Sequence, residues 1–338
     1  MAELLANHTT LRVGGPASDF VVADTEQALV EAVREADDQD KPVLVLGGGS
    51  NLLVSDSGFD GRVVAVRTSG VVADADACGG AVVRVAAGES WDDLVARAVA
   101  EGWVGIEALS GIPGQVGATP IQNVGAYGQE VAQSVASVRC WDREAREVRT
   151  LFVRDCRFGY RTSRFKQEPD RWVVLEVVLQ LRLGDLGAPV AYAELARALG
   201  VDVGERVPLA AVRDAVLGLR RSKGMVLDPV DHDTWSAGSF FTNPVLPADR
   251  VPAGAPAWPQ PDGTVKTSAA WLIEQAGFER GHGTERAALS TRHTLALTNR
   301  GGATATELIT LAREVRGRVR ERFGIELVNE PVLVGCSL

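Results

Sequence analysis

Residues 42–51 have the sequence PVLVLGGGSN, a short apolar run that opens into three consecutive glycines. The run 43–46 predicts a buried strand, and the glycines predict a tight turn directly after it. Backbone N–H groups that lack neighbouring Cβ atoms can point at a phosphate, and Ser50 and Asn51 add donors. The stretch lacks the third glycine of a Rossmann fingerprint and the Gly-Lys-Ser/Thr ending of a P-loop. Taken alone, it is compatible with a phosphate cradle and with a plain glycine turn.

Helix and strand patterns alternate on both sides of this stretch. Thr25 and Ser90 are each followed by apolar residues at helical spacing, and the second of these helices is expected to stop at Gly102. The sequence predicts strands at 62–66, 82–86, 135–141, 175–183 and 328–335. It also predicts later helices that begin after Pro208, after Thr267 and after Thr304, the last with a capping box from Glu307 and a stop at Gly324.

Composition narrows the class of protein. The chain has 338 residues, so two or three domains are expected. Its formal net charge of −9 argues against nucleic acid or an anionic membrane as the main partner. No stretch is apolar enough to be a signal core or to span a bilayer, and four scattered cysteines indicate reduced thiols. We therefore expect a cytoplasmic protein without membrane insertion. Separately from composition, we expect a monomer.

A second glycine-rich stretch, SGIPGQVGATPIQNVGAYG, covers residues 110–128. It is too apolar for a flexible linker or a surface loop, yet it carries a few definite polar groups in Gln122, Asn123 and Tyr127. A buried loop has backbone groups that need partners, and a large cofactor can supply them. Two glycine loops in one chain favour a ligand of dinucleotide size over a single phosphate.

A basic cluster follows in CRFGYRTSRFK, residues 156–166. Its arginines could hold a carboxylate or phosphate through two parallel hydrogen bonds, although a solvated surface face explains the cluster equally well. The four histidines show no metal-ligand spacing, so no metal site is predicted.

Seven motifs, taken in order, resemble the UDP-N-acetylenolpyruvoylglucosamine reductases, the MurB family, along essentially the whole chain. They are NHTT (7–10) with Gly14-Gly15, LGGGSN (46–51), SGIPGQVGATPIQNVGAYG (110–128), CRFGYRTSRFK (156–166), AGSFFTNP (237–244), DGTVKTSAAWLIEQAG (262–277) and NEPVLVG (329–335). Each motif alone is weak, but all seven in this order are highly specific.

The resemblance implies a mixed α/β fold. Two FAD-binding subdomains of the vanillyl-alcohol-oxidase type would cover residues 1–69 and residues 70–225, the second together with a C-terminal strand at 325–338. A substrate-binding α/β domain would cover residues 226–324. The implied activity is the FAD-dependent, NADPH-driven reduction of UDP-N-acetylglucosamine enolpyruvate to UDP-N-acetylmuramate in peptidoglycan precursor synthesis. FAD is expected to be non-covalent, because neither glycine loop contains a His or Cys.

The resemblance also implies roles for individual residues. Catalytic roles fall on Arg161, Ser239 and Glu330. FAD contacts are implied for Gly47, Gly48, Gly49, Ser50, Asn51, Ser110, Gly111, Ile112, Pro113, Gly114, Gly117, Ala118, Gln122, Asn123, Gly125 and Tyr127. Substrate contacts are implied for Tyr192, Lys223, Asn243, Trp258, Lys266 and His293, of which Tyr192 is similar to the substrate-clamping tyrosine of the family's type I branch.

Two other functions remain as alternatives at this point. The first is an oxidase of the same FAD architecture that acts on a sugar alcohol or lactone, although Ser239 and Glu330 would then have no clear task. The second is a nucleotide-binding regulatory module without catalysis. A purified protein that takes up no flavin would favour the regulator.

Overall fold

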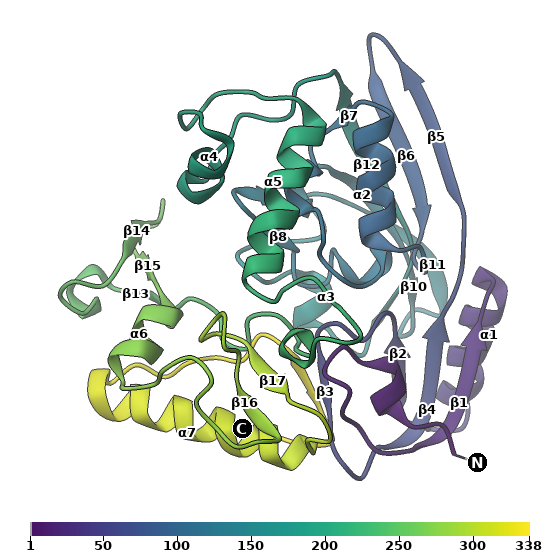
Figure 1. The fold of residues 1–338 in the computed structure, drawn as a ribbon. Helices are drawn as coiled ribbons and strands as arrows, with labels where there is room; N and C mark the ends of the chain where they lie inside the picture. Colours follow the sequence, from purple (N-terminus) through teal and green to yellow (C-terminus); the bar gives the residue numbers. More distant parts are fainter. Residues whose placement is uncertain (1) are drawn as a thin grey trace. The chain divides into compact units, whose positions relative to one another are not determined.

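The structure is a computed structural model that describes residues 2–338. The chain forms two compact units, each assembled from separate parts of the sequence (Figure 1). The first unit comprises Ser18–Gly48 and Asp60–Ser222, and we call it the six-stranded unit after its largest sheet. The second unit comprises Met1–Ala17, Gly49–Phe59 and Lys223–Leu338, and we call it the C-terminal unit. The boundary between the units therefore passes through the first glycine loop.

A large antiparallel sheet with the strand order β11-β10-β12-β6-β5 forms the centre of the six-stranded unit. Its strands are β5 (Val71–Asp76), β6 (Gly80–Ala86), β10 (Val135–Asp142), β11 (Glu147–Phe152) and β12 (Trp172–Leu183), with β7 (Trp103–Val104) paired to the end of β12. The middle strand β12 begins with four consecutive buried residues, whereas the edge strand β5 is largely exposed. This arrangement confirms the antiparallel strands expected at 135–141 and 175–183.

A smaller sheet in the same unit has the order β1-β4-β2, with strands β1 (Ala17–Ala23), β2 (Val43–Leu46) and β4 (Phe59–Val66). Helix α1 (Glu26–Asp37) connects β1 to β2, and the Thr25 hydroxyl caps it by accepting the N–H of Ala28. Strands β2 and β4 run parallel. The first glycine loop thus leaves the carboxyl end of a parallel strand, a usual place for a ligand in α/β structures.

Helix α2 (Trp91–Ala100) follows β6 and is capped by Ser90, as the sequence predicts. It packs on the large sheet through a fully buried Trp91, whose indole N–H donates to the carbonyl of Leu109 at 3.1 Å. Helices α4 (Ala193–Leu199) and α5 (Leu209–Ser222) pack on each other in the same unit, and α3 (Arg164–Gln167) is a single turn. Short 3-10 turns η2 (Glu107–Leu109), η3 (Val116–Ala118) and η4 (Val131–Gln133) and the hairpin β8 (Gly125–Ala126) and β9 (Gln129–Glu130) occupy the second glycine stretch and the residues that border it.

The C-terminal unit contains three small sheets and two helices. Its elements are β3 (Leu52–Val54) parallel to β18 (Val332–Val334), the sheet β13-β15-β14 (Val245–Leu246, Val265–Thr267, Ala257–Pro259), the hairpin β16-β17 (Ala287–Leu289, Leu297–Asn299), α6 (Ala269–Gln275), α7 (Ala305–Phe323), and the turns η1 (Leu5–His8), η5 (His232–Thr234) and η6 (Ala248–Arg250). One face of α7 is buried in the core of this unit, together with Phe240, Phe241 and Phe278.

Helix α7 begins with the capping box that the sequence predicts. The Thr304 hydroxyl accepts the N–H of Glu307, and the Glu307 carboxylate accepts the N–H of Thr304. Asp56 adds a second cap from a distant segment, because its carboxylate accepts the N–H groups of Ala305 and Thr306 at 2.7 and 3.0 Å. Burial alone would raise the pKa of Asp56, but these bonds and one from the Thr306 hydroxyl outweigh it and lower that pKa.

Three sequence-based expectations differ from the structure. The cap of α6 is Ser268, because Thr267 still belongs to β15 and donates its hydroxyl to the carbonyl of Pro256. The final strand is only Val332–Val334, shorter than the expected 328–335, because the residues before it bond to the segment around Phe241. This strand was expected to join residues 70–225, whereas it pairs with β3 in the C-terminal unit. The division into three domains otherwise stays a prediction.

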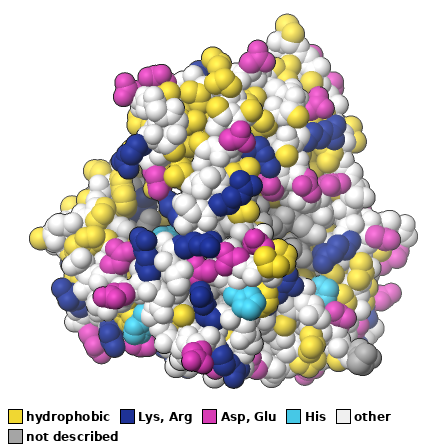
Figure 2. Space-filling model, in the orientation of Figure 1, with side chains coloured by type: hydrophobic (Ala, Val, Ile, Leu, Met, Phe, Trp, Pro, Cys, Tyr) yellow, Lys and Arg dark blue, Asp and Glu magenta, His cyan; other side chains and the backbone are white. Residues whose placement is uncertain are grey.

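Within residues 2–338, no helix is both long and apolar enough to cross a membrane. Figure 2 shows acidic and basic side chains interspersed over the face in view, so the net charge of −9 does not gather into one patch on that face.

Candidate active site

The two glycine loops meet inside the six-stranded unit. A Cβ atom added to Gly48 would lie 2.8 Å from the Cα of Gly114, and one added to Gly47 would lie 3.0 Å from Oε1 of Gln115. Real side chains do not tolerate the first of these approaches, so position 48 has to be glycine. The structure therefore places residues from both loops against each other.

Gln115 contributes a polar atom at this meeting point. Its amide nitrogen donates to the carbonyl of Val66 at 2.9 Å, which fixes the orientation of the side chain. Its Oε1 is buried and accepts no hydrogen bond within residues 2–338. A buried acceptor of this kind suits a ligand that carries hydroxyl or N–H donors. Sequence reasoning missed Gln115, although a polar residue between two glycines of the loop was a usable signal.

Asp92, at the start of α2, anchors the second glycine loop. Its Oδ1 accepts the N–H of Gly111 at 2.6 Å, and its two oxygens accept a pair of hydrogen bonds from Arg213 of α5 at 2.6 and 2.9 Å. Burial would raise the pKa of Asp92, but the bonds from Arg213 and Gly111 outweigh burial and lower that pKa. Asp92 was not predicted, because its partners are far away in the sequence.

Several predicted cofactor residues use their polar groups within the protein. The Ser110 hydroxyl is fully buried and donates to the carbonyl of Glu107 at 2.7 Å. The N–H of Gly117 donates to the carbonyl of Ala87, where an added Cβ would lie 2.5 Å from the Ala87 side chain. These groups shape the loop, while Ile112, Pro113 and Ala118 lie along it.

Asn123 holds the end of the loop. Its side-chain N–H groups donate to Glu130 at 2.8 Å and to the carbonyl of Gly159 at 3.0 Å, and its oxygen accepts the N–H of Ala132 at 3.1 Å. Its backbone has a φ of 49°, a left-handed conformation that is uncommon outside glycine. The side chain predicted to bind FAD is thus engaged in joining this loop to the turn that carries Arg161.

Arg161 lies in a tight turn in which Gly159 and Thr162 exchange two backbone hydrogen bonds, at 3.0 and 3.3 Å. Its φ of 52° places it in the left-handed region, which costs on the order of 1 kcal/mol for a residue with a side chain. Its Nη2 donates to the carbonyl of Gly125 at 2.6 Å. The guanidinium is therefore fixed to the second glycine loop, in a conformation that the turn imposes on it.

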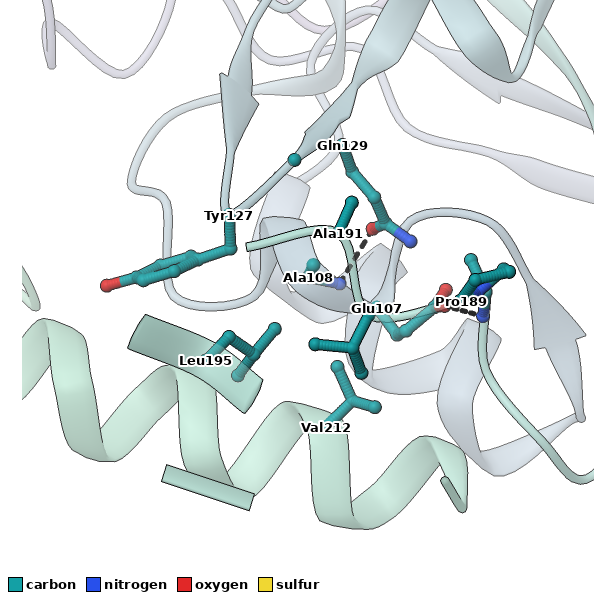
Figure 3. Close-up of a pocket in the computed structure, with 11 residues that line it drawn as sticks. Glu107, Ala108, Tyr127, Gln129, Pro189, Ala191, Leu195 and Val212 are labelled. Atoms are coloured by element: carbon teal, nitrogen blue, oxygen red, sulfur yellow. Dashed lines mark hydrogen bonds between the residues drawn. The ribbon is translucent and has the colours of Figure 1, made fainter. Parts of the chain in front are cut away.

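Tyr127 and Tyr192 meet edge to face, with ring centroids 5.7 Å apart. Figure 3 shows Tyr127 among the residues that line a small cavity, together with Glu107, Ala191 and Leu195. This cavity has a volume of about 10 Å³, which is far too small for a nucleotide. Burial raises the pKa of the Tyr127 hydroxyl to about 12.

Arg220 is a buried cation on the apolar face of α5, with only 9% of its surface exposed. Burial lowers the pKa of its guanidinium, and the nearby Tyr127 and Asp92 act in the opposite direction. Sequence reasoning missed it, although a charged residue four positions after Val216 on an apolar face was a visible anomaly.

In the C-terminal unit, Ser239 and Glu330 lie at the ends of two segments that pair. The N–H of Glu330 donates to the carbonyl of Phe240 at 2.8 Å, and Phe241 forms an antiparallel bridge with Asn329. Both phenylalanines are buried, so the backbone on which Ser239 sits is fixed. The structure thus brings together two of the three predicted catalytic residues within one unit.

Asn51 joins the same cluster from the first glycine loop. Its Nδ2 donates to the carbonyl of Glu330 at 3.3 Å, and its own carbonyl accepts the N–H of Val332 at 2.9 Å. Gly49, two residues earlier, has a φ of 61°, and a Cβ there would lie 1.9 Å from the carbonyl oxygen of His8. The loop from Gly49 to Asn51, which includes Ser50, is therefore bound on both sides by its own unit.

Three predicted substrate residues gather around the sheet β13-β15-β14 of the C-terminal unit. Trp258 and Lys266 are directly opposite each other on neighbouring strands, and Trp258 is 42% exposed. The side chain of Asn243 accepts the N–H of Ala269 at 2.9 Å and so supports the start of α6. His293 and Lys223 belong to the same unit, whereas Tyr192 belongs to the six-stranded unit.

Known proteins resemble this chain over nearly its full length. The UDP-N-acetylenolpyruvoylglucosamine reductase of Cutibacterium acnes is 58% identical, over 99% of this chain and 90% of that protein. That of Thermobifida fusca is 56% identical, over 99% of this chain and 97% of that protein. The chain belongs to the UDP-N-acetylenolpyruvoylglucosamine reductase family.

Two family models match separate parts of this reductase sequence. Residues 17–151 match an FAD binding domain, and residues 228–334 match the C-terminal domain of UDP-N-acetylenolpyruvoylglucosamine reductase. A crystal structure of the reductase from Thermus caldophilus aligns with a TM-score of 0.65 at 26% identity, over 99% of this chain and 98% of that one. These matches confirm the family, the expected mixed fold and FAD as the cofactor.

The two glycine loops of the six-stranded unit suit FAD, the cofactor of the reductase family. Glycine at positions 47 and 48 lets the first glycine loop pack directly against Gln115 and Gly114 of the second loop. The buried Oε1 of Gln115 offers an acceptor to a hydroxyl or N–H donor of the cofactor.

Within residues 2–338, no group of three or more His, Cys, Asp and Glu side chains could hold a metal ion.

Proposed function

We propose that this chain reduces UDP-N-acetylglucosamine enolpyruvate to UDP-N-acetylmuramate, with FAD as cofactor and NADPH as the source of hydride. The observation that carries the proposal is the pairing of the Ser239 and Glu330 segments through the 2.8 Å bond from Glu330 to Phe240. A reduction of this kind needs a proton donor held at a fixed place. The family membership supplies the substrate class and the place in peptidoglycan precursor synthesis.

Both glycine loops hold the cofactor in this proposal. Residues 47–51 bind its pyrophosphate through backbone N–H groups, and Ser110–Tyr127 enclose the rest, with Gln115 as an additional contact. When bound, FAD supplies the hydride that reaches the terminal alkene carbon of the substrate. No His or Cys lies in either loop, so the cofactor is bound without a covalent link.

Arg161 binds the carboxylate of the enolpyruvyl group. Addition of hydride places negative charge on the carbon next to that carboxylate, and the charge spreads into its oxygens. A guanidinium stays ionised and matches a carboxylate with two parallel bonds, so it stabilises this charge better than an ammonium group. The bond from Arg161 to the carbonyl of Gly125 holds the guanidinium in one orientation before substrate arrives.

Ser239 donates a proton to the carbon that carries this charge. A serine hydroxyl is a weak acid in water, but an enolate-like carbon is basic enough to take a proton from a hydroxyl held beside it. Glu330 orients or polarises this array, and its backbone is fixed by Phe240 on one side and by Asn51 on the other.

The remaining contacts and properties follow the family. Substrate is held by Tyr192, Lys223, Asn243, Trp258, Lys266 and His293. The three-domain division places these contacts largely in the domain at 226–324. The enzyme is a monomer and works in the cytoplasm.

Anaerobic mixing tests the proposal. The yellow protein is first mixed with NADPH and then with the enolpyruvyl nucleotide sugar, while the visible absorbance of the flavin is followed. Bleaching by NADPH and recovery on addition of the nucleotide sugar are expected. A protein that is bleached by a sugar alcohol but not by NADPH would contradict the proposal and favour an oxidase.

A further inference from the structure

The NHTT motif near the N-terminus carries part of the family resemblance but has no assigned role. The structure gives its last residue two partners. The N–H of Thr10 donates to the carbonyl of Gly49 at 3.2 Å, and its hydroxyl donates to the carbonyl of Ser236 at 2.7 Å. Thr10 is 6% exposed, so both bonds are shielded from water. One buried residue thus joins the first glycine loop to the segment that leads into Ser239.

Only two residues separate Ser236, which accepts the bond from Thr10, from Ser239. The side chain of Ser236 is buried and accepts the N–H of Gly238 at 3.2 Å, and Gly238 directly precedes Ser239. On the other side of Ser239, the N–H of Phe240 donates to the carbonyl of Leu295 at 2.7 Å. The backbone of Ser239 is therefore fixed on both sides. The Thr10 hydroxyl holds the side that precedes Ser239, through its bond to Ser236.

The near end is equally tight. Gly49 approaches the N-terminal segment so closely that an added Cβ would lie 2.8 Å from the Cα of Thr9. The N–H of Arg12 donates to the carbonyl of Thr9 and closes a turn around Thr10. The glycine loop thus sets the position of the turn around Thr10. Through the Thr10 hydroxyl, that turn sets the position of the Ser236 carbonyl.

We infer that Thr10 is a positioning residue, whose hydroxyl holds the Ser239 segment in register with the first glycine loop. The inference rests on the proposed function, in which Ser239 donates a proton. Placing a reacting group wrongly by about 1 Å can cost on the order of 100-fold in rate, so loss of one such bond has a measurable effect.

Three variants test this role. Thr10→Val removes the hydroxyl and keeps the volume, and Thr10→Ser restores the hydroxyl. Thr9→Val is the matched control, because Thr9 is equally buried and its hydroxyl donates to the carbonyl of Val13 at 3.0 Å, away from Ser236. Thermal unfolding of all three shows how much general stability each change removes.

The first readout does not depend on activity. Hydrogen exchange of a peptide that covers residues 235–241 is measured in the full-length protein with FAD bound. Thr10→Val is expected to speed exchange at Gly238 and Phe240, whereas Thr10→Ser and Thr9→Val leave it as in the parent protein. Equal acceleration in Thr9→Val would show a general loosening of the unit and would overturn the inference.

The second readout is the single-turnover recovery of flavin absorbance after reduction with dithionite and addition of the enolpyruvyl nucleotide sugar. Thr10→Val is expected to slow recovery about 10-fold, with a larger solvent deuterium effect than in the parent protein. In the double variant Thr10→Val with Ser239→Ala, recovery is expected to be no slower than in Ser239→Ala alone, because Thr10 acts through Ser239.

The outcomes separate this inference from the proposed function. If Ser239→Ala does not slow recovery, then Ser239 is not the proton donor and the proposed function fails at that residue. If Ser239→Ala slows recovery but Thr10→Val behaves like Thr9→Val, only the role of Thr10 is wrong. Additive effects in the double variant would also contradict it.

Discussion

Glu330 donates its backbone N–H to the carbonyl of Phe240, the residue that follows Ser239, at 2.8 Å. A strand bridge between Phe241 and Asn329 continues this pairing. The distance between the two segments is thus set by the backbone, and a change in either side chain leaves that distance as it is. This allows side-chain variants at both positions to be interpreted chemically.

Ser239→Ala tests the proton donor. The change removes one hydroxyl and almost no volume, so folding and flavin content are expected to survive. Reduction of the flavin by NADPH does not use the donor and should stay near normal. Recovery with the enolpyruvyl nucleotide sugar should slow by about 10²–10⁴-fold, the usual cost of losing a general acid. Single-turnover absorbance measurements separate the two half-reactions.

Ser239→Cys is the companion variant, because a thiol can donate a proton from nearly the same position. It should be partly active. If Ser239→Ala slows both half-reactions equally, the residue is structural, and the proton comes from Glu330 or water.

Arg161→Lys should behave as a severe change. Lysine offers a point charge in place of a planar fork, so it cannot present two parallel N–H groups to a carboxylate while it also bonds to the carbonyl of Gly125. We expect slow recovery with the nucleotide sugar and a smaller effect on reduction by NADPH, both measured by stopped-flow absorbance. Normal recovery in this variant would mean that Lys223 or Lys266 holds the carboxylate.

Gly48→Ala tests the contact between the glycine loops. The new methyl group would lie 2.8 Å from the Cα of Gly114 and force the loops apart. Overpacking of this kind costs about 1–3 kcal/mol, so FAD should bind about 5- to 150-fold more weakly. Titration of flavin-free protein with FAD measures the affinity.

Gly218→Ala is the control for this change. Gly218 lies in α5 of the same unit, and nothing approaches a Cβ there within 4 Å. Its FAD affinity should equal that of the parent protein. Equal affinities in both variants would show that the meeting of the loops is not needed for the cofactor.

Asp92→Asn should make stability less dependent on pH. The folded state lowers the pKa of Asp92, so its carboxylate stabilises the fold above its unfolded pKa of about 3.9, and this stabilisation is lost as pH falls through the folded pKa. We expect the asparagine variant to be about 1 kcal/mol less stable at neutral pH and similar to the parent protein in acid. Urea unfolding across this pH range measures both.

Asp93→Asn provides the matched control, because this neighbour lies in the same turn of α2 but is exposed. It removes the same charge near the helix terminus without touching Gly111 or Arg213. If both variants show the same pH dependence, the helix terminus and not the anchor accounts for the effect.

FAD should leave the protein on acid precipitation and colour the supernatant. His8 is the histidine next to the first glycine loop, where its carbonyl borders Gly49, but its ring Nε2 is engaged with Glu3 at 2.8 Å. The expected result is therefore full release, in the parent protein and in His8→Ala alike. Colour that stays with the pellet would show a covalent link.

The sequence predicted features that depend on neighbouring residues. The cap at Ser90, the capping box at Thr304 and the position of the strand at 43–46 are confirmed, because each depends on spacing within a few residues. That strand was expected to be buried, but only Leu46 is fully buried and the other three residues are half-buried. Asp92, Gln115 and Arg220 were missed, because their importance comes from partners on other elements. Ser268 was missed as the cap of α6 because two adjacent hydroxyl residues fit the same pattern.

The candidate site was predicted from whole motifs. A motif identifies which residues belong to the site, but it does not predict which hydrogen bonds their side chains form. The side chains of Asn123 and Ser110 were expected to contact FAD, yet both are engaged in shaping the loop. Such roles depend on which carbonyl lies opposite, and a single sequence does not contain that information.

The parallel pairing of β3 with β18 has a consequence for the order in which the nascent chain can fold during translation. Asn51 and Glu330, which join these strands, are 279 residues apart. At a synthesis rate of roughly 5–20 residues per second, β3 leaves the ribosome some tens of seconds before its partner exists. Its edge is open for pairing during that interval, and the C-terminal unit cannot close until translation is nearly finished.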